Sequence, residues 1–557
     1  MSGINIWAVN DGEKVYKNDF RNSNKYGNSV WDGQTVRLFS GKNETVAFQI
    51  VFENGGFEQN RIDIKLKNLE QFKIEVFKEH YLYIAKNRIS PPAWFYAEGG
   101  RPTNWGWTPD ALIPVDVCGG ININPDETQG FWFDLYIPRD TPHGQYGGEI
   151  EISSSNNGFI ASLPIKINIK NITLDDDFRR KNMIYVGGVK DYYPNNSESI
   201  RDEFRKMARA HGFDIVGSQA HSKMFDREFL DGYYDKYMRD GDNLFTPKYG
   251  YDSWGMGRGE RIFPIGMYGG PILGEGEEQT TAEAQKWENW FKEKSWKGMY
   301  YWYICDEPKE NQYAAVREKS GWLKKRGITL PVFTTSWFKP ELEGYIDHWS
   351  SGHGVNIKDR NSRPEDNFSF YNGYSPAAPM VNIDGSALEF RVNQWLKERY
   401  DVDLYFYWEG THWQHNHSGP RRHTHLNIWQ DPITFIIQGD PALEKDDPRN
   451  RDLNFVNGDG TFFYPGNDPY FPENSLYYDG PIGCIRMKNL RRGAQDATYI
   501  QMAKDIGLAD KADKIIKEAV PVGMSEANLS QPPSWSLRGN DWDKYRLEIM
   551  DLFEFNY

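Results

Sequence analysis

Three things are scarce in this chain of 557 residues: cysteine, net positive charge and long apolar runs. Only Cys118, Cys305 and Cys484 occur, far apart, so the sequence offers neither a disulfide framework nor a cysteine-based zinc site. The formal net charge of −14 disfavours nucleic acid or an anionic membrane as the main partner, because clustered lysine and arginine bind both. No apolar run approaches the roughly 18 residues of a transmembrane helix, so we expect no membrane span.

The first residues, Met1-Ser2-Gly3, show no signal-peptide pattern. We therefore expect a cytoplasmic protein, or a secreted or periplasmic one if a leader has been removed. The length exceeds that of one ordinary domain, which predicts two or three domains. The oligomeric state has no signal in the sequence.

Aromatic residues are abundant: they make up 15% of the chain, with 20 Trp and 33 Tyr. Sugar rings stack on such side chains, although tryptophan also serves ordinary core packing. The composition therefore favours a glycan or oligosaccharide as the partner. No sequence pattern indicates a cofactor.

Residues 1–172 alternate between apolar and polar side chains with a period of two. Val46, Phe48, Ile50 and Phe52 share one face of an expected strand, and similar short runs follow, separated by Gly, Asn and Pro. This pattern is typical of an antiparallel β-sandwich. The acidic stretch 170–180 is the expected linker to a second domain, residues 181–557.

In the second domain, short apolar runs alternate with amphipathic helical stretches. Eight such runs are found, at 183–187, 213–217, 262–265, 299–304, 331–335, 345–348, 368–372 and 404–408. Eight strands alternating with helices predict a (β/α)8 barrel of the TIM type. Further helices are expected at 486–506, 509–520 and 541–555, so the predicted fold is multidomain, a β-sandwich followed by a barrel with a helical C-terminal extension.

The fourth run is strongly aromatic and ends in Asp306, Glu307 and Pro308. Pro308 cannot donate to a ladder, so the strand should end there, at the face where barrel enzymes keep their catalytic residues. Of two neighbouring carboxyl groups, one stays ionised while the other holds its proton longer, and glycoside cleavage needs both states. The alternative is that the two acids cap the helix expected at 311–325.

Glu409 follows the eighth run and is expected at the same face. In a two-carboxylate retaining glycosidase, Glu307 would be the acid/base and Glu409 the nucleophile, with carboxyl groups roughly 5 to 5.5 Å apart. The alternative is a hydrogen-bonding residue that holds a sugar hydroxyl or a loop amide. The barrel register adds candidate substrate contacts, which are Trp337, His348, Tyr371, Asn372 and Trp408. Packing is the better explanation for each of them taken alone, but together at one face they indicate a pocket.

Five of the eleven histidines follow closely, at His412, His415, His417, His423 and His425. Imidazole can bind zinc or copper. However, the spacing matches no paired signature, and Arg421 and Arg422 disfavour a cation. We therefore predict a polar, substrate-lining loop and no metal.

Several stretches, in order along the chain, resemble glycoside hydrolase family 123, the β-N-acetylgalactosaminidase family. The N-terminal part is similar in GKNETVAFQ at 41–49 and PRDTPHGQY at 138–146. The barrel part is similar in CDEP at 305–308, YNG at 371–373 and YW at 407–408. The tail is similar in GDG at 458–460, YPG at 464–466, IR at 485–486 and LRRGAQD at 490–496.

The resemblance implies a glycoside hydrolase that removes a terminal β-linked N-acetylgalactosamine, or a related 2-acetamido sugar, from glycans. The implied mechanism is retaining and substrate-assisted, through an oxazolinium intermediate. In it Asp306 orients the acetamido group, and Glu307 protonates the leaving oxygen and then activates water. The residues leave open a retaining glycosidase that uses Glu307 and Glu409 on sugars without an acetamido group, and a non-catalytic glycan-binding protein.

Overall fold

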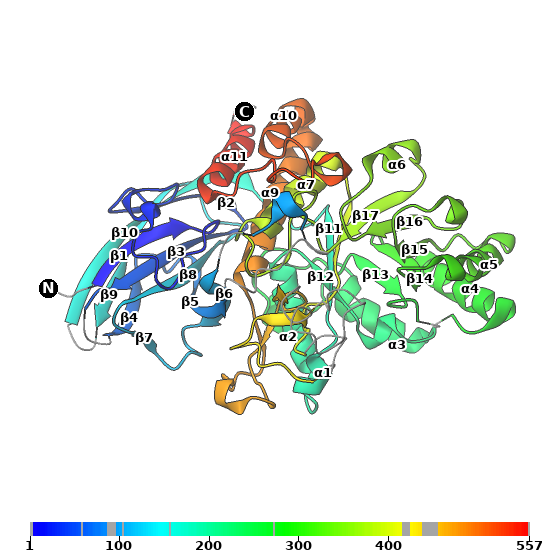
Figure 1. Cartoon of the computed structure of the whole chain (residues 1–557), viewed down its shortest axis with the longest axis horizontal. Helices are drawn as coiled ribbons and strands as arrows, with labels where there is room; N and C mark the ends of the chain where they lie inside the picture. The colour runs from blue at the N-terminus through cyan, green and yellow to red at the C-terminus, as the bar shows by residue number, and fades with distance from the viewer. Residues whose placement is uncertain are drawn as a thin grey trace.

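The computed structural model describes residues 4–56, 60–85, 96–102, 105–154, 158–270, 273–414, 424–436 and 455–554. An N-terminal half made of strands and a half containing the barrel lie side by side, and helices from the end of the chain lie above and between them (Figure 1).

The N-terminal half contains two five-stranded sheets. In order across the first, all antiparallel, are β1 (Ile4–Asn10), β3 (Glu44–Asn54), β8 (Glu127–Ile137), β5 (Lys73–Ile84) and β6 (Gly106–Pro114). In order across the second are β2 (Val36–Lys42), β10 (Gly158–Thr173), β9 (Gly144–Ser154), β4 (Asn60–Lys67) and β7 (Ile121–Ile123). The pair β2 and β10 is parallel, so the expectation of a purely antiparallel sandwich is wrong at this one ladder.

Strand β3 is buried along its whole length. Phe48 and its period-two neighbours pack in the core between the sheets, as the alternation predicts. The opposite face is covered as well, because Ala47 packs with Ile485 from the C-terminal part of the chain. The first sheet is therefore a layer between the core of its own half and the rest of the molecule.

The second half is built on eight parallel strands. They are β11 (Lys181–Tyr185), β12 (Asp214–Val216), β13 (Ile262–Ile265), β14 (Met299–Asp306), β15 (Val332–Thr335), β16 (His348–Ser351), β17 (Asn367–Tyr371) and β18 (Leu404–Tyr407). The strands follow one another from β13 to β18, and β18 pairs with β11, which pairs with β12. Within the described residues, β12 and β13 stand at the two ends of the sheet and form no ladder with each other, so the barrel is nearly closed.

Seven of the predicted strands overlap the observed ones closely, and the sixth is displaced. The prediction was 345–348, whereas β16 begins at His348. Tyr345 belongs to the turn before it, because its backbone N–H bonds the carbonyl of Leu342. The Asp347 carboxylate accepts a 2.8 Å hydrogen bond from the N–H of Val332, which fixes the point where β16 starts beside β15.

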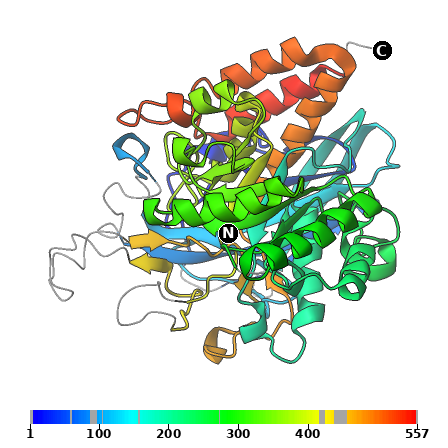
Figure 2. The same ribbon diagram turned by 90° about the vertical axis from the view of Figure 1, so that its right-hand side faces the viewer.

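Helices alternate with these strands less regularly than predicted. The bounds are α1 (Val189–Tyr192), α2 (Ser197–Ala210), α3 (Arg227–Tyr233), α4 (Gly276–Lys294), α5 (Tyr313–Lys325), α6 (Ile357–Ser362) and α7 (Glu389–Tyr400). Between β15 and β16 there is only the short 3-10 turn Pro340–Leu342. Seen from the barrel side, green helices cross the front of the molecule and the C-terminal helices lie at the top (Figure 2). Of the helices described, none is long and apolar enough to cross a bilayer.

The stretch 170–180 is not a loose linker. Strand β10 continues to Thr173, and the backbone carbonyl of Asp175 accepts a 2.7 Å hydrogen bond from the indole of Trp254. The Asp176 carboxylate accepts bonds from Asn43 at 2.7 Å and from the N–H of Gly255 at 3.1 Å. The acidic residues thus bind both halves, and the division into domains 1–172 and 181–557 stays a prediction.

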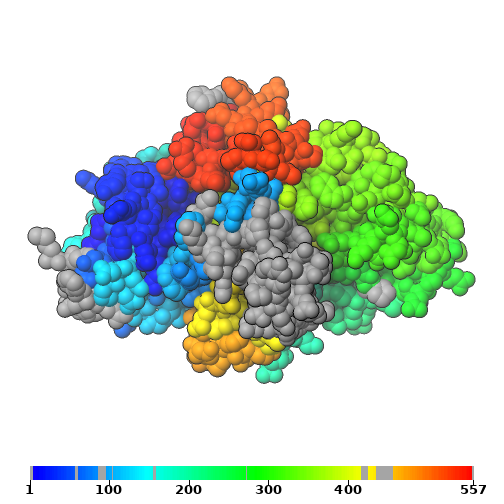
Figure 3. Space-filling model, viewed as in Figure 1, coloured from blue at the N-terminus to red at the C-terminus, as the bar shows by residue number. Residues whose placement is uncertain are grey.

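The C-terminal helices are α9 (Ile485–Ala503), α10 (Ala509–Ala519) and α11 (Gly539–Asp551), close to the predicted ranges. Helix α9 is almost wholly buried and carries the basic residues of the tail motif. Arg486 pairs with Asp110 at 2.8 Å, Lys488 with Asp134 at 2.7 Å and Arg492 with Glu44 at 2.9 Å. Buried charges need such partners, so this row of ion pairs fixes the position of the sandwich relative to the barrel. The red C-terminal segment accordingly lies over both halves (Figure 3).

Candidate active site

A β-bulge at the end of β14 brings Asp306 to the inner face of the barrel. In the ladder with β15, Tyr303 pairs with Phe333 and Asp306 with Thr335, with one extra residue between them on β14. Side chains alternate along a strand, so the bulge reverses the alternation at this point. Cys305 consequently packs against the outer cluster, and Asp306 follows Tyr303 inward.

The Asp306 carboxylate is held by protein hydroxyl groups through one oxygen. Tyr303 and Thr335 donate to Oδ1 at 2.7 and 2.6 Å. Within the described residues, Oδ2 accepts no hydrogen bond and remains available to a bound molecule. The α5 helix begins after an N-cap at Gln312, so neither Asp306 nor Glu307 is its N-cap.

Glu307 reaches the same site because the backbone turns at this residue. Its φ angle is +40°, in the left-handed region that a glutamate rarely adopts. Its N–H donates to Thr335 Oγ1 at 2.8 Å, and the Tyr371 hydroxyl donates to Glu307 Oε1. Two consecutive residues of a regular strand would point to opposite faces, and this turn allows both carboxylates to lie at the same end of the barrel.

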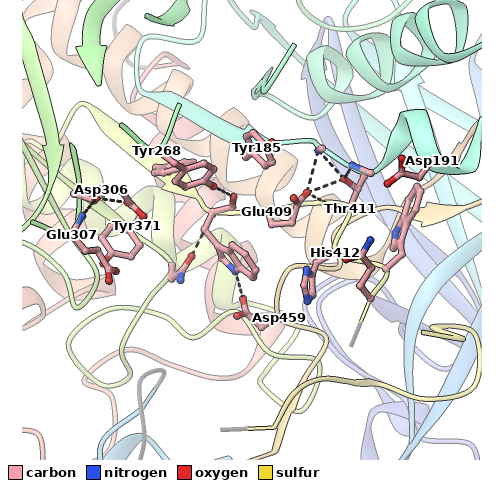
Figure 4. Close-up of a pocket in the computed structure, with 18 residues that line it drawn as sticks. Tyr185, Asp191, Tyr268, Asp306, Glu307, Tyr371, Glu409, Thr411, His412 and Asp459 are labelled. Atoms are coloured by element: carbon pink, nitrogen blue, oxygen red, sulfur yellow. Dashed lines mark hydrogen bonds between the residues drawn. The ribbon is translucent and has the colours of Figure 1, made fainter. Parts of the chain in front are cut away.

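The two acids lie at one end of a cavity of about 660 Å³. In Figure 4, Asp306, Glu307 and Tyr371 lie at one side, Asp191 and His412 at the other, and Glu409 between them. The predicted residues that line the cavity are Asp306, Glu307, Tyr371, Asn372, Trp408 and Glu409. A further group that the sequence did not indicate also lines it: Tyr185, Tyr268, Thr411 and Asp459.

The indole of Trp408 forms a fixed wall of this cavity. Its Nε1 donates to Asp459 Oδ1 at 2.9 Å, and the Tyr407 hydroxyl donates to the same oxygen at 3.3 Å. Burial raises the pKa of Asp459 to about 6. Asp459 belongs to the GDG stretch of the tail, which was noted only as part of the family resemblance.

Tyr268 and Tyr185 form an aromatic wall beside the acids. Tyr268 follows β13, has a φ angle of +55° and donates its hydroxyl to the carbonyl of Trp408. Its ring meets the edge of the Tyr185 ring at a centroid distance of 5.1 Å. Neither residue belongs to a recognisable motif, so only the assembled barrel reveals them.

Glu409 is buried, and its Oε1 atom is surrounded by donors. The N–H groups of Gly187, Gly410 and Thr411 donate to it at 3.5, 3.0 and 2.7 Å, and the Thr411 hydroxyl at 2.8 Å. Burial still dominates and raises the pKa of Glu409 from 4.5 to about 7. Glu409 therefore anchors the loops after β11 and β18 and presents only its second oxygen, Oε2, to a ligand.

The raised pKa of Glu409 predicts a pH-dependent stability. As pH rises from 4.5 to 7, this carboxyl group ionises in the unfolded chain before it ionises in the folded protein, so the free energy of unfolding decreases. Glutamine does not titrate. The difference in Tm between Glu409→Gln and wild type should become more positive between about pH 5 and about pH 8, by an amount equivalent to about 1 to 3 kcal/mol. Thermal unfolding across this range measures it, with Glu310→Gln at an exposed position as the control; a constant difference would contradict the shift.

The structure places His348 away from the cavity, which corrects its assignment as a substrate contact. It stands at the start of β16 and is buried in the barrel interior, with Phe333 at a ring distance of 5.0 Å. Its Nε2 is 2.8 Å from Ser369 Oγ, and burial lowers its pKa to about 4. The displaced sixth strand is the reason, because the residue expected at the end of the strand is in fact its first.

Trp337 lies beside the main cavity, in a second one of about 470 Å³. The two cavities share Glu307, Thr335, Tyr371 and Asn372.

Of the histidine cluster, His415, His417 and His423 lie outside the described residues. His412 lines the main cavity beside Trp408, at a ring distance of 5.3 Å. His425 stacks on Tyr470 instead. Within the described part of the chain, no group of three or more His, Cys, Asp or Glu side chains could hold a metal ion.

Comparison with known proteins finds a family model that matches part of the chain. Residues 280–503 match the model of the glycoside hydrolase 123 catalytic domain. The whole fold is similar to that of a family 123 glycoside hydrolase from Clostridium perfringens, with a TM-score of 0.65 and 11% identity over 99% of this chain and 98% of that one. No curated protein sequence matches the chain.

Other solved structures cover only part of the chain. A FixG-related protein from Vibrio parahaemolyticus has a TM-score of 0.15 and 9% identity over 30% of this chain and 99% of its own. A PapD-like domain of human CEP192 has a TM-score of 0.14 and 12% identity over 31% and 88%.

The matched region runs from α4 to the end of α9 and contains Asp306, Glu307, Tyr371, Trp408 and Glu409. It therefore includes the bulged strand, the turn after it and most of the cavity wall. The resemblance noted in the sequence is confirmed by this match to the glycoside hydrolase 123 catalytic domain, and the protein is a glycoside hydrolase.

Proposed function

We propose that the protein removes a terminal β-linked N-acetylgalactosamine, or a related 2-acetamido sugar, from a glycan with retention of configuration. The observation that carries the proposal is the arrangement of Asp306 and Glu307. Tyr303 and Thr335 hold one oxygen of Asp306, and Tyr371 holds one oxygen of Glu307. The second oxygen of each accepts no hydrogen bond from the described residues, and both residues line the same cavity. Such a pair can serve two positions of one sugar residue at once.

In the proposed mechanism the substrate supplies the nucleophile. The carbonyl oxygen of the 2-acetamido group attacks the anomeric carbon while Glu307 gives its proton to the glycosidic oxygen, and the bond to the leaving group breaks. Asp306 accepts a hydrogen bond from the acetamido N–H and stabilises the positive charge of the oxazolinium ring. Glu307, now ionised, takes a proton from a water molecule that attacks the anomeric carbon, and the ring opens.

The environment of Glu409 supports this mechanism over one with a protein nucleophile. Its Oε1 accepts hydrogen bonds from four donors, and the side chain is buried. These bonds already use much of the negative charge with which a nucleophile would attack the sugar. Asp306, by contrast, is the immediate neighbour of Glu307 and has a free oxygen. The Clostridium perfringens enzyme was studied for glycolipid glycan hydrolysis, which is consistent with a glycan substrate here.

A panel of aryl β-glycosides with and without a 2-acetamido group tests the proposal. We expect turnover of the acetamido sugars only, and competitive inhibition by a thiazoline that mimics the cyclic intermediate. Turnover of sugars without this group, together with covalent labelling of Glu409 by a fluorosugar, would instead establish the two-carboxylate mechanism. Tight glycan binding without any turnover would indicate a binding protein.

The hydrogen bond from Tyr371 to Glu307 makes a separate prediction. Tyr371→Phe removes the donor that orients the proposed acid/base, so kcat on an acetamido glycoside should fall by about tenfold to a hundredfold with little change in KM. Steady-state kinetics measure the split between kcat and KM. Tyr374→Phe is the matched control, because the Tyr374 ring packs at a tilt against His353, at a ring distance of 4.4 Å, and Tyr374 lines neither cavity. Equal kcat values for wild type and Tyr371→Phe would exclude this orienting contact.

A further inference from the structure

The second cavity borders the main one at the proposed acid/base. Glu307 lines both cavities, whereas Asp306 lines only the larger one. A general acid must reach the oxygen that joins the two parts of its substrate. If Asp306 holds the acetamido sugar in the larger cavity, the group on the other side of the glycosidic oxygen points into the smaller one.

We propose that the second cavity is the subsite for the leaving group and that it takes an acidic sugar. This inference rests on the proposed function, because it uses Glu307 as the acid and Asp306 as the acetamido contact. The chemical class follows from two side chains that no catalytic step uses, Trp337 and Lys339.

Trp337 supplies the surface for a sugar ring. It follows β15, is half-buried and lines the cavity next to Ser336 and His353. The ring of His353 lies 6.3 Å from that of Trp337. An indole face packs on the C–H face of a pyranose, and the polar neighbours meet its hydroxyl groups. A plain alkyl chain would offer no polar partner to His353 or Lys339, whereas the Ser336 hydroxyl already donates to the carbonyl of Trp337 at 2.8 Å.

Lys339 supplies the charge. It is half-buried and is the one lysine or arginine among the described residues that line the second cavity. Across the described chain, no carboxylate forms an ion pair with it. The main cavity, by contrast, is lined by Asp191, Asp306, Glu307, Glu409 and Asp459. A neutral sugar therefore suits the main cavity, and a carboxylate or sulfate group on the next residue suits Lys339.

The test compares four substrates that share one β-linked 2-acetamido sugar. Their leaving groups are an aryl group, a neutral hexose, a uronic acid and a sulfated hexose. For the wild type we expect kcat/KM to be at least about fivefold higher for one or both acidic disaccharides than for the neutral one, and the two acidic substrates distinguish carboxylate from sulfate. Added salt should reduce this preference, since the pairing is electrostatic.

Substitutions then assign the preference to the cavity. Lys339→Met should abolish it while changing kcat/KM for the aryl glycoside less than about twofold, and Lys339→Arg should retain it. Trp337→Ala should lower kcat/KM for all three disaccharides by about tenfold, whether or not they are acidic. Lys309→Met, at an exposed lysine that lines neither cavity, is the matched control.

The outcomes distinguish a failure of the leaving-group inference from a failure of the proposed function. Hydrolysis of the aryl acetamido glycoside with no preference among the disaccharides would overturn the leaving-group inference alone. The inference would also be overturned if Lys339→Met lost as much kcat/KM on the aryl glycoside as on the acidic disaccharides, because Lys339 would then be acting on Glu307. No hydrolysis of any acetamido glycoside would overturn the proposed function, and this inference with it.

Discussion

The Glu307→Gln variant is expected to lose about 10²- to 10⁴-fold in kcat on glycans with a poor leaving group, the range that general acid/base catalysis supplies. Glutamine keeps the size of the side chain and can still accept the hydrogen bond from Tyr371, but it has no proton to give to the glycosidic oxygen. The loss should be smaller on aryl glycosides, whose leaving groups need little protonation. Steady-state kinetics on both substrate types measure this difference.

Azide adds a readout that a merely structural loss would not show. It needs no general base to attack the anomeric carbon, so it should restore turnover of an aryl acetamido glycoside by Glu307→Gln and yield the β-glycosyl azide. Glu310→Gln is the control, because Glu310 is an exposed acid three residues further along, outside both cavities. Undiminished hydrolysis by Glu307→Gln would remove Glu307 from the mechanism.

The Asp306→Asn variant is expected to lose about 10²- to 10³-fold in kcat/KM for acetamido glycosides, as when one preorganised electrostatic contact is removed. Asparagine can still accept hydrogen bonds from Tyr303 and Thr335, so the fold around the bulge should be retained. It no longer carries the negative charge that stabilises the oxazolinium ring. The affinity for a thiazoline mimic should therefore fall in parallel with kcat/KM.

A comparison of the two variants separates the proposed roles of the acids. Azide should rescue Glu307→Gln but not Asp306→Asn, because a better nucleophile does not replace a missing charge beside the acetamido group. Thermal unfolding should show a Tm close to that of wild type for Asp306→Asn, which excludes simple misfolding. If Asp306→Asn hydrolyses acetamido glycosides at the wild-type rate, substrate assistance through this residue is wrong.

Much of the barrel could be predicted because buried parallel strands are encoded locally. A strand covered on both faces is a short continuous apolar run, and all eight such runs became strands of one sheet. The sixth run was displaced because its start depends on the contact of Asp347 with Val332, which comes from the neighbouring strand. The same error moved His348 from the predicted site into the core.

The residues of the site could be predicted only in part from the sequence. Asp306 and Glu307 could be chosen because two acids and a proline end an aromatic strand. The sequence could not show that both carboxylates face the same cavity, since this depends on a bulge in the ladder with β15 and on the left-handed backbone at Glu307. Asp459 and Tyr268 enter the cavity from distant parts of the chain and have no signal in the local pattern.

The sequence by itself determined the strand-rich first half, the eight runs, the acidic tip and the basic tail motif, because each depends on neighbours within a few residues. The tertiary structure alone decided which partners these residues meet. Arg486 and Asp110 are 376 positions apart, and only their burial at the same interface makes them a pair. Likewise, only the assembled barrel divides the site into two cavities at Glu307. The side chains at this division come from separate strands, and no local pattern shows that they meet.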